Sequence, residues 1–254
     1  MRVAVLVKDV PDLEALVKVV DGGAALDVEK RRMLNFFDEI AVEAALGLRE
    51  TAGASTFAVA AGAGTGMEAV RRALAMGIEQ AFLVDDPALE GADPLTAARA
   101  LAAVVGREGY DLVLAGRQST DDEAGVVGPM VAELLGVPCV TGAVEVSVAD
   151  GTATCVREIP GGRETVRVAL PAVVTAEKGL AVPRVPSMMG TMKAMKAQVP
   201  KETFAALDVE AAAPLAVVGY RGPAARQPVT MLEGDAAEAA AQLVRLLRAE
   251  SRVL

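Results

Sequence analysis

The chain has 254 residues, of which 53% are hydrophobic and only 3% aromatic, and its formal net charge is −9. A chain of this size can bury a large core in one domain or slightly more. The negative charge argues against nucleic acid and anionic membranes as main partners. The sequence contains no histidine, so the usual acid–base group at neutral pH and the commonest zinc ligand are missing. Binding or electron transfer is therefore favoured over hydrolase or transferase chemistry.

A strand pattern begins at Arg2, which leaves no room for a signal peptide, and no apolar run reaches the ~18 residues of a membrane span. We therefore expect a cytoplasmic protein with no direct membrane insertion. The two cysteines, Cys139 and Cys155, are too far apart for a metal-binding or redox CxxC motif. They are expected to be free thiols, buried or partly buried, in a reducing compartment.

Strands and helices alternate through the first half of the chain. Apolar runs predict strands at 3–7, 56–60, 81–84 and 112–114, and apolar residues at helical spacing predict helices at 38–50, 68–76, 94–108 and 129–135. A loop with the polar turn Asp21-Gly22-Gly23 separates the first strand from the first helix. Short links between the other elements are typical of a parallel sheet with helices on both faces. The predicted fold class is α/β, with a doubly wound, mostly parallel, Rossmann-like sheet.

The pattern changes after Pro138. Strands predicted at 144–147, 152–158 and 164–168 are joined by hairpin turns at Asp150-Gly151 and Gly161-Gly162, which indicates a small antiparallel addition. Prolines predict an irregular chain over 183–214, and a last amphipathic helix is predicted at 235–248. We expect a nucleotide-binding α/β domain over residues 1–200 and an extended C-terminal arm over 201–254 that packs on another subunit.

The loop after the predicted strand at 112–114 is the first candidate for a binding site. It runs from Gly116 to Pro129, where a helix begins. Backbone N–H groups and the positive end of a helix dipole favour a phosphate at such a place. Ligands also usually bind at the carboxyl ends of strands in open α/β sheets. The loop therefore predicts a nucleotide site, in which Asp121, Asp122 and Glu123 either make polar contacts or only complement the dipole.

A second glycine-rich turn, Gly62-Ala63-Gly64-Thr65-Gly66, also follows a strand and precedes a helix, and Asp85 ends the next strand. This arrangement is similar to a dinucleotide fingerprint with its ribose-binding acid. The glycines are spaced GxGxG, however, without the third glycine of GxGxxG. A tight turn that lines a pocket is the favoured interpretation, and a Rossmann dehydrogenase is the alternative among enzymes.

Several further segments can be compared with known families. They are Leu6-Val7-Lys8, the run 34–45 that begins Leu34-Asn35-Phe36-Phe37-Asp38, and the segments 72–77, 111–118, 157–162, 170–175 and Pro183-Arg184 followed by Met192-Lys193-Ala194. In this order and at this spacing they resemble the electron transfer flavoprotein beta subunit family over residues 1–200. None of them would suffice alone.

The resemblance implies a heterodimer with a larger alpha subunit, which holds most of the FAD. Such a pair carries electrons from flavin dehydrogenases, such as acyl-CoA dehydrogenases, to a downstream acceptor such as a quinone oxidoreductase. The redox chemistry then belongs to the flavin, and this chain is expected to be an electron carrier with no catalytic residues and no metal site. Phe37 and the loop from Lys8 to Leu13 would supply peripheral flavin contacts.

The family's beta subunit also holds an AMP, generally regarded as structural, which implies a pocket built from three parts of the chain. Asp122 would accept hydrogen bonds from a hydroxyl, an adenine amine or backbone N–H groups. Carried onto this sequence, the residues of the pocket are Leu6, Asn35, Phe36, Phe37, Asp38, Ala61, Gly116, Arg117, Gln118, Ser119, Thr120, Asp121, Asp122, Gly125, Val126 and Val127.

This chain departs from the family pattern at Gly125 and Val127, where many AMP-binding members have Asn and Thr, and at Phe36, where a proline is usual. A related electron-bifurcating branch places a second FAD in the same pocket, commonly with Gly at the position of Asp122. Asp122 favours AMP here, and a second FAD is the alternative. Outside electron transfer, the alternative is a stand-alone adenine-nucleotide-binding domain.

A methionine-rich segment, 184–196, carries the other implied function. In the family it recognises partner dehydrogenases through one apolar residue, which matches Met188 here. Prolines are expected to hold the segment extended, and flexible thioethers suit varied apolar grooves. Packing in the core or against the alpha subunit is the alternative. The residues assigned to partner recognition are Arg184, Val185, Pro186, Ser187, Met188, Met189, Gly190, Thr191, Met192 and Lys193.

Overall fold

The computed structural model describes residues 1–210, 215, 217–226 and 228–251. It divides into two compact units, Met1–Tyr220 and Arg221–Leu254. The second unit contains α7 (Ala236–Leu246), which begins at a capping box formed by Asp235 and Glu238 and continues into a π-helical turn, Leu247–Ser251. Parts of the predicted arm, Pro214 among them, lie outside the described residues. Among those described, no helix is long and apolar enough to cross a membrane.

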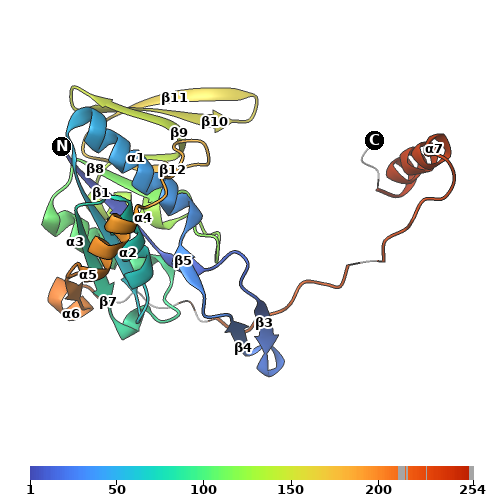
Figure 1. The fold of residues 1–254 in the computed structure, drawn as a ribbon, viewed down its shortest axis with the longest axis horizontal. Coiled ribbons are helices and arrows are strands. Elements are labelled where there is room, and N and C mark those ends of the chain that lie inside the picture. Colours follow the sequence, from blue (N-terminus) through green and yellow to red (C-terminus); the bar gives the residue numbers. More distant parts are fainter. Residues whose placement is uncertain (211–214, 216, 227, 252–254) are drawn as a thin grey trace. The chain divides into compact units, whose positions relative to one another are not determined.

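A nine-stranded sheet forms the centre of the first unit (Figure 1). Its strands are β1 (Arg2–Leu6), β6 (Ser55–Gly62), β7 (Gln80–Asp85), β8 (Leu112–Gly116), β9 (Cys139–Ala149), β10 (Thr152–Ile159), β11 (Gly162–Ala169), β12 (Ala172–Ala176) and β13 (Lys201–Glu202). Their order is β11-β10-β9-β12-β8-β1-β6-β7-β13. All neighbouring pairs are parallel except β9–β10 and β10–β11. The predicted mostly parallel sheet with a small antiparallel addition is confirmed.

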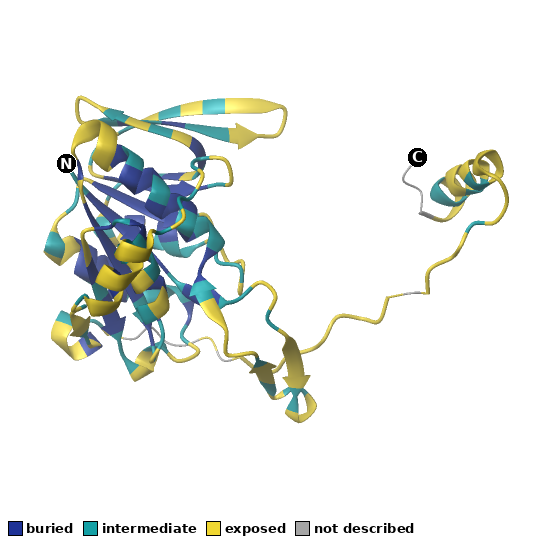
Figure 2. Cartoon of the chain, viewed as in Figure 1, coloured by how far each residue is buried: buried dark blue, intermediate teal, exposed yellow. Residues whose placement is uncertain are grey.

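Helices cover both faces of this sheet, and the alternation of apolar residues in β1 shows why. Val3 and Val5 pack with α1 (Phe36–Ala52) and α2 (Met67–Met76) on one face. Ala4 and Leu6 pack with α3 (Pro94–Glu108) and α4 (Val127–Leu135) on the other. Strands buried on both faces are typical of parallel sheets, and Figure 2 shows the buried residues concentrated there. The cysteines are free, with Cys155 buried and Cys139 partly buried, as predicted.

The segment between β1 and α1 is more structured than the predicted loop. Two short strands, β2 (Asp9–Pro11) and β5 (Arg32–Leu34), pair with each other, and a hairpin of β3 (Val17–Val20) and β4 (Ala25–Val28) extends beyond them. The polar turn Asp21–Gly23 joins the hairpin strands. These strands are too short to give a clear period in the sequence, so the prediction missed them.

The prediction of an irregular chain over 183–214 is wrong for two stretches that form helices: α5 (Met188–Lys196) and α6 (Phe204–Leu207). Ser187 caps α5, because its Oγ accepts the N–H of Gly190 at 3.0 Å. The partner-recognition segment is therefore extended only as far as Ser187 and is helical from Met188 onward. Gly190 lets α5 approach α2 closely, since an added Cβ would lie 2.6 Å from the carbonyl oxygen of Ala75.

Candidate functional site: a nucleotide pocket at the switch point of the sheet

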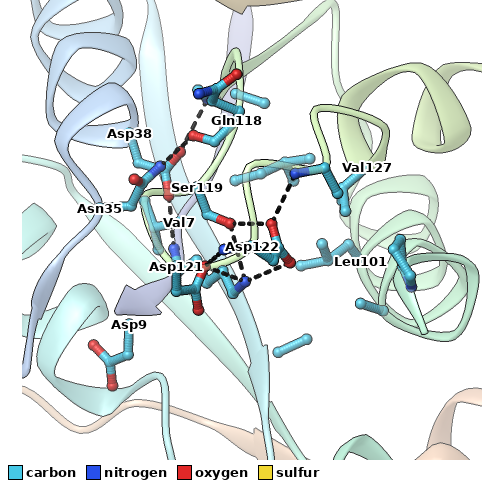
Figure 3. A pocket seen from close by; sticks show the side chains of 18 of the residues that line it. Val7, Asp9, Asn35, Asp38, Leu101, Gln118, Ser119, Asp121, Asp122 and Val127 are labelled. Atoms are coloured by element: carbon cyan, nitrogen blue, oxygen red, sulfur yellow. Dashed lines mark hydrogen bonds and ion pairs between the residues drawn. The ribbon is translucent and has the colours of Figure 1, made fainter. Parts of the chain in front are cut away.

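A pocket opens at the carboxyl ends of three neighbouring strands. From β1 the sheet continues through β6 and β7 in one direction and through β8 and β12 in the other, so the strand order reverses beside β1. Such a switch point is where open α/β sheets bind their ligands. The cavity measures about 230 Å³ and is lined by the segments that follow β1, β6 and β8 and by the start of α3. Figure 3 shows how its polar side chains lie.

The three predicted parts of the chain meet in this pocket. Phe36, Phe37 and Thr120 lie outside the lining: Phe36 packs against the core, and the rings of Phe36 and Phe37 lie nearly perpendicular with their centroids 5.3 Å apart. The predicted residues that line the cavity are Leu6, Asn35, Asp38, Ala61, Gly116, Arg117, Gln118, Ser119, Asp121, Asp122, Gly125, Val126 and Val127. Residues that are far apart in the sequence are thus brought to one cavity.

Asn35 ties the start of α1 to the loop that follows β8. Its side chain is 1% exposed, and its Nδ2 donates to the carbonyl oxygen of Gln118 at 2.8 Å. Its Oδ1 accepts the N–H of Thr120 at 3.2 Å. Thr120 therefore acts on the pocket through its backbone. An asparagine that satisfies two backbone groups in this way holds the loop in one conformation.

Asp38 lines the pocket and joins the segment after β1 to the end of β8. It lies in the first turn of α1 and is 6% exposed. Its Oδ2 accepts the N–H of Lys8 at 2.9 Å, and its Oδ1 accepts that of Gly116 at 3.0 Å. Burial raises the pKa of Asp38 to about 7, although hydrogen bonds and the charge of Lys8 favour the ionised form.

Lys8 gathers the acidic part of the loop into a compact cluster. Its Nζ lies 3.0 Å from Ser119 Oγ, 2.8 Å from Asp121 Oδ1 and 3.1 Å from Asp122 Oδ2. Ser119 donates in turn to Asp122 Oδ1 at 2.8 Å, and Figure 3 shows these side chains converging. Burial opposes ionisation of Asp122, but the N–H of Ala124, the Ser119 hydroxyl and Lys8 outweigh it and lower its pKa. Asp122 thus helps to fold the loop.

Two glycines allow the backbone to pass close to its neighbours here. A Cβ added to Gly116 would lie 2.3 Å from Asp38 Oδ1 and 2.8 Å from Phe37 Cβ. A Cβ added to Gly128 would lie 2.6 Å from Thr175 Cγ2. All three distances are shorter than real Cβ contacts, so the loop and the start of α4 favour glycine at these positions.

One wall of the pocket is apolar, and its residues were not predicted from the sequence. It comes from the segment between β7 and α3 and from the first turns of α3, and it consists of Leu89, Ala92, Pro94, Ala97 and Leu101. Such a wall suits the face of a planar ring. The order of the predicted elements could have revealed this wall, because a helix that follows a neighbouring parallel strand begins at the same edge of the sheet.

The glycine-rich turn 62–66 is a tight turn beside the pocket, as favoured, and Gly62 and Thr65 line the cavity. Two of its N–H donors, those of Gly64 and Gly66, are already used by the chain itself. Asp9 accepts the N–H groups of Gly66 and Ala69, and Asp85 accepts that of Gly64 at 2.7 Å. The N–H groups of Gly64, Gly66 and Ala69, which a dinucleotide fingerprint would offer to a phosphate, are therefore already bonded within the chain.

A second candidate surface lies on α5 and the segment before it. Its apolar side chains are exposed, Met188 to 83%, so they do not belong to the core of this chain. We call it the methionine surface, and its residues are Val182, Val185, Met188, Met189, Met192 and Met195. Several large apolar side chains exposed within one short segment are typical of a protein interaction site.

The chain was compared with known proteins. It matches the family model described as "Electron transfer flavoprotein domain" over residues 24–207. It is 33% identical to the "Electron transfer flavoprotein subunit beta" of Bacillus subtilis (strain 168) over all of both chains. It is 39% identical to the protein of the same name from Syntrophomonas wolfei over 82% of each chain. For the one from Sus scrofa the identity is 36%, covering 100% of this chain and 99% of the other.

Proposed function

The chain belongs to the electron transfer flavoprotein family as a relative of its beta subunits, and we propose that it works as an electron carrier in a heterodimer with an alpha subunit. The alpha subunit holds most of the FAD. The pair accepts electrons from flavin dehydrogenases, such as acyl-CoA dehydrogenases, and passes them to an acceptor such as a quinone oxidoreductase. The flavin supplies the reversible uptake of electrons, and this chain supplies binding surfaces.

The pocket at the switch point binds AMP. The observation that carries this assignment is the meeting of Leu6, Asn35, Asp38, Ala61 and the loop after β8 around one cavity. The loop and the start of α4 face the phosphate with backbone N–H groups and the positive end of the helix dipole. These backbone groups replace the side-chain contacts that Gly125 and Val127 cannot make. The apolar wall on α3 receives the adenine.

The methionine surface docks the dehydrogenase, with Met188 as the residue that inserts into the partner. This docking role is supported by the exposure of Met188 and Met189 in the first turn of α5. Long, unbranched thioether side chains adapt to grooves of different shape. Arg184 does not present its charge to a partner, because its guanidinium is turned toward α1, where it contacts Glu43 and Glu50.

The test is to coexpress this chain with its alpha subunit, purify the complex and identify the nucleotides released on denaturation. A yellow heterodimer that releases one FAD and one AMP is the expected result. Two flavins per heterodimer would support the bifurcating alternative instead. A colourless homodimer would contradict the proposal and support a stand-alone nucleotide-binding domain.

A further inference from the structure

The pocket lies between two turns, each of which ends a strand and begins a helix. On the β8 side the helix is α4, and among the described residues no side chain caps its N-terminus. On the β6 side the helix is α2, which follows the glycine-rich turn. Both N-termini would favour an anion if their N–H groups were available. The two N-termini differ in whether a side chain of the protein already accepts their N–H groups.

On the β6 side the anion position is filled by Asp9. Oδ2 of Asp9 accepts the N–H of Gly66, and Oδ1 accepts that of Ala69 in the first turn of α2. Asp9 is 6% exposed, although it lines the pocket. Figure 3 shows its carboxylate apart from the cluster around Ser119. A carboxylate bonded to two N–H groups at a helix N-terminus is a stable arrangement that a ligand must displace or avoid.

A second N–H group of the turn, that of Gly64, is also bonded within the chain. The N–H of Gly64 donates to Asp85, whose other oxygen lies 2.8 Å from Lys201 Nζ. A Cβ added to Gly66 would lie 2.7 Å from Leu83 Cδ1, so the turn is packed tightly against β7. The turn therefore cannot open toward the pocket without breaking several contacts of the chain.

In a sheet with this strand order, a dinucleotide lies across the crevice, with one half on each side of the switch point. A mononucleotide needs only one side. We propose that Asp9 is a specificity-determining residue that restricts the pocket to a mononucleotide, because its fixed carboxylate occupies the β6 side, where the other half of a dinucleotide would lie. This inference rests on the proposed function, in which the pocket holds an adenine nucleotide.

The charges near Asp9 support this exclusion. A phosphate group on the β6 side would meet a carboxylate in place of two N–H donors, and like charges at short range repel strongly in a partly desolvated site. Arg32 also lines this side, and its Nη2 donates to the main-chain oxygen of Asp9 at 2.8 Å. Arg32 as a residue is exposed, so solvent and salt screen its attraction for a ligand.

The test compares AMP with NAD⁺, a dinucleotide that contains AMP, on the heterodimer after removal of the bound nucleotide from the pocket. Asp9→Asn removes the charge and keeps the side-chain volume, and Asp9→Ala removes both oxygens. Asp85→Asn is the matched control, because it changes a carboxylate at the end of β7 that accepts an N–H of the same turn but does not line the cavity. Calorimetric titration gives Kd for each nucleotide and each protein.

We expect the ratio of Kd for NAD⁺ to Kd for AMP to fall about tenfold in both Asp9 variants and to stay unchanged in Asp85→Asn. An unchanged ratio in Asp9→Asn, which keeps the volume of the side chain, would overturn the inference. So would a wild-type heterodimer that binds NAD⁺ as tightly as AMP. If the wild-type heterodimer bound no AMP at all, the proposed pocket itself would be refuted, and this inference with it.

Discussion

Arg184 and Glu43 fasten the segment before α5 to α1. Arg184 Nε lies 2.9 Å from Glu43 Oε2, Nη2 lies 2.7 Å from Oε1, and the main-chain N–H of Arg184 donates to Oε2 at 3.0 Å. Burial opposes ionisation of Glu43, but its hydrogen bonds with Arg184 outweigh it and lower the pKa. Three donors from one residue fix both the side chain and the backbone at this point. Arg184 therefore acts on the methionine surface by positioning it.

Replacing Glu43 by Gln is expected to lower the free energy of unfolding by about 1 kcal/mol, because one partner of a part-exposed bidentate pair loses its charge. Electron transfer from the dehydrogenase should slow as the segment loosens. Glu50→Gln is the control, since Glu50 is more exposed and contacts only Nη1. Denaturant unfolding measures the first effect, and equal losses in the two variants would contradict the positioning role.

Met188→Ala is expected to reduce kcat/KM for electron transfer from the cognate dehydrogenase about tenfold, as truncation of an interface anchor does. The flavin and AMP contents should not change, because Met188 is exposed and does not line the pocket, and the FAD is proposed to be held mainly by the alpha subunit. Met195→Ala, an exposed methionine at the other end of α5, is the control and should have a smaller effect. Identical rates for Met188→Ala and wild type would refute the docking proposal.

Asp122→Ala is expected to reduce the AMP retained on purification while the fold persists. The variant loses the acceptor for Ser119 and Ala124 and one partner of Lys8, so the loop loses its fixed conformation. Glu123→Gln changes a neighbouring acid that does not line the cavity and serves as the control. Nucleotide released per heterodimer is the measurement, and full AMP content in Asp122→Ala would rule out this role.

The proton of Asp38 should make stability depend on pH. Its pKa rises from 3.8 to about 7 on folding, so between these values the folded chain keeps a proton that the unfolded chain has released. The free energy of unfolding therefore falls as pH rises through this window, by about 4 kcal/mol in total.

Asp38→Asn cannot titrate and should lack this component. The difference in unfolding free energy between wild type and Asp38→Asn is measured across pH 4 to 7 (about 1.4 kcal/mol per unit for a single proton). As pH rises, wild type should lose unfolding free energy relative to Asp38→Asn. A constant difference would show that Asp38 is ionised throughout.

Gly116→Ala is expected to destabilise the chain by about 1–3 kcal/mol, because the new Cβ overlaps Asp38 and Phe37. Gly47→Ala is the matched control. Gly47 lies within α1 and nothing is within 4 Å of its added Cβ, so alanine should be neutral or stabilising there. The thermal unfolding midpoints of the two variants are compared. Similar midpoints for Gly116→Ala and Gly47→Ala would contradict the close approach at Gly116.

Much of the fold could be predicted from periodicity alone. The predicted helix at 94–108 coincides with α3, and the other predicted strands and helices of the first half differ from the observed ones by a few residues at their ends. Periodicity failed at β2–β5 and at α5. The paired strands are too short for a period, and α5 depends on packing against α2 and on the Ser187 cap, which override the nearby prolines.

The sequence by itself determined the doubly wound sheet, the family, and the three parts of the chain that meet at the pocket. These follow from local patterns of apolar residues and from motifs, which are read without knowing what lies beside them. Only the tertiary structure decided which groups are already satisfied. Asp9 and Gly66, and Arg184 and Glu43, are far apart in the chain, and no local pattern predicts that they meet. The spacing of the glycine-rich turn favoured a tight turn, but only the fold showed that Asp9 accepts the N–H groups of Gly66 and Ala69 there.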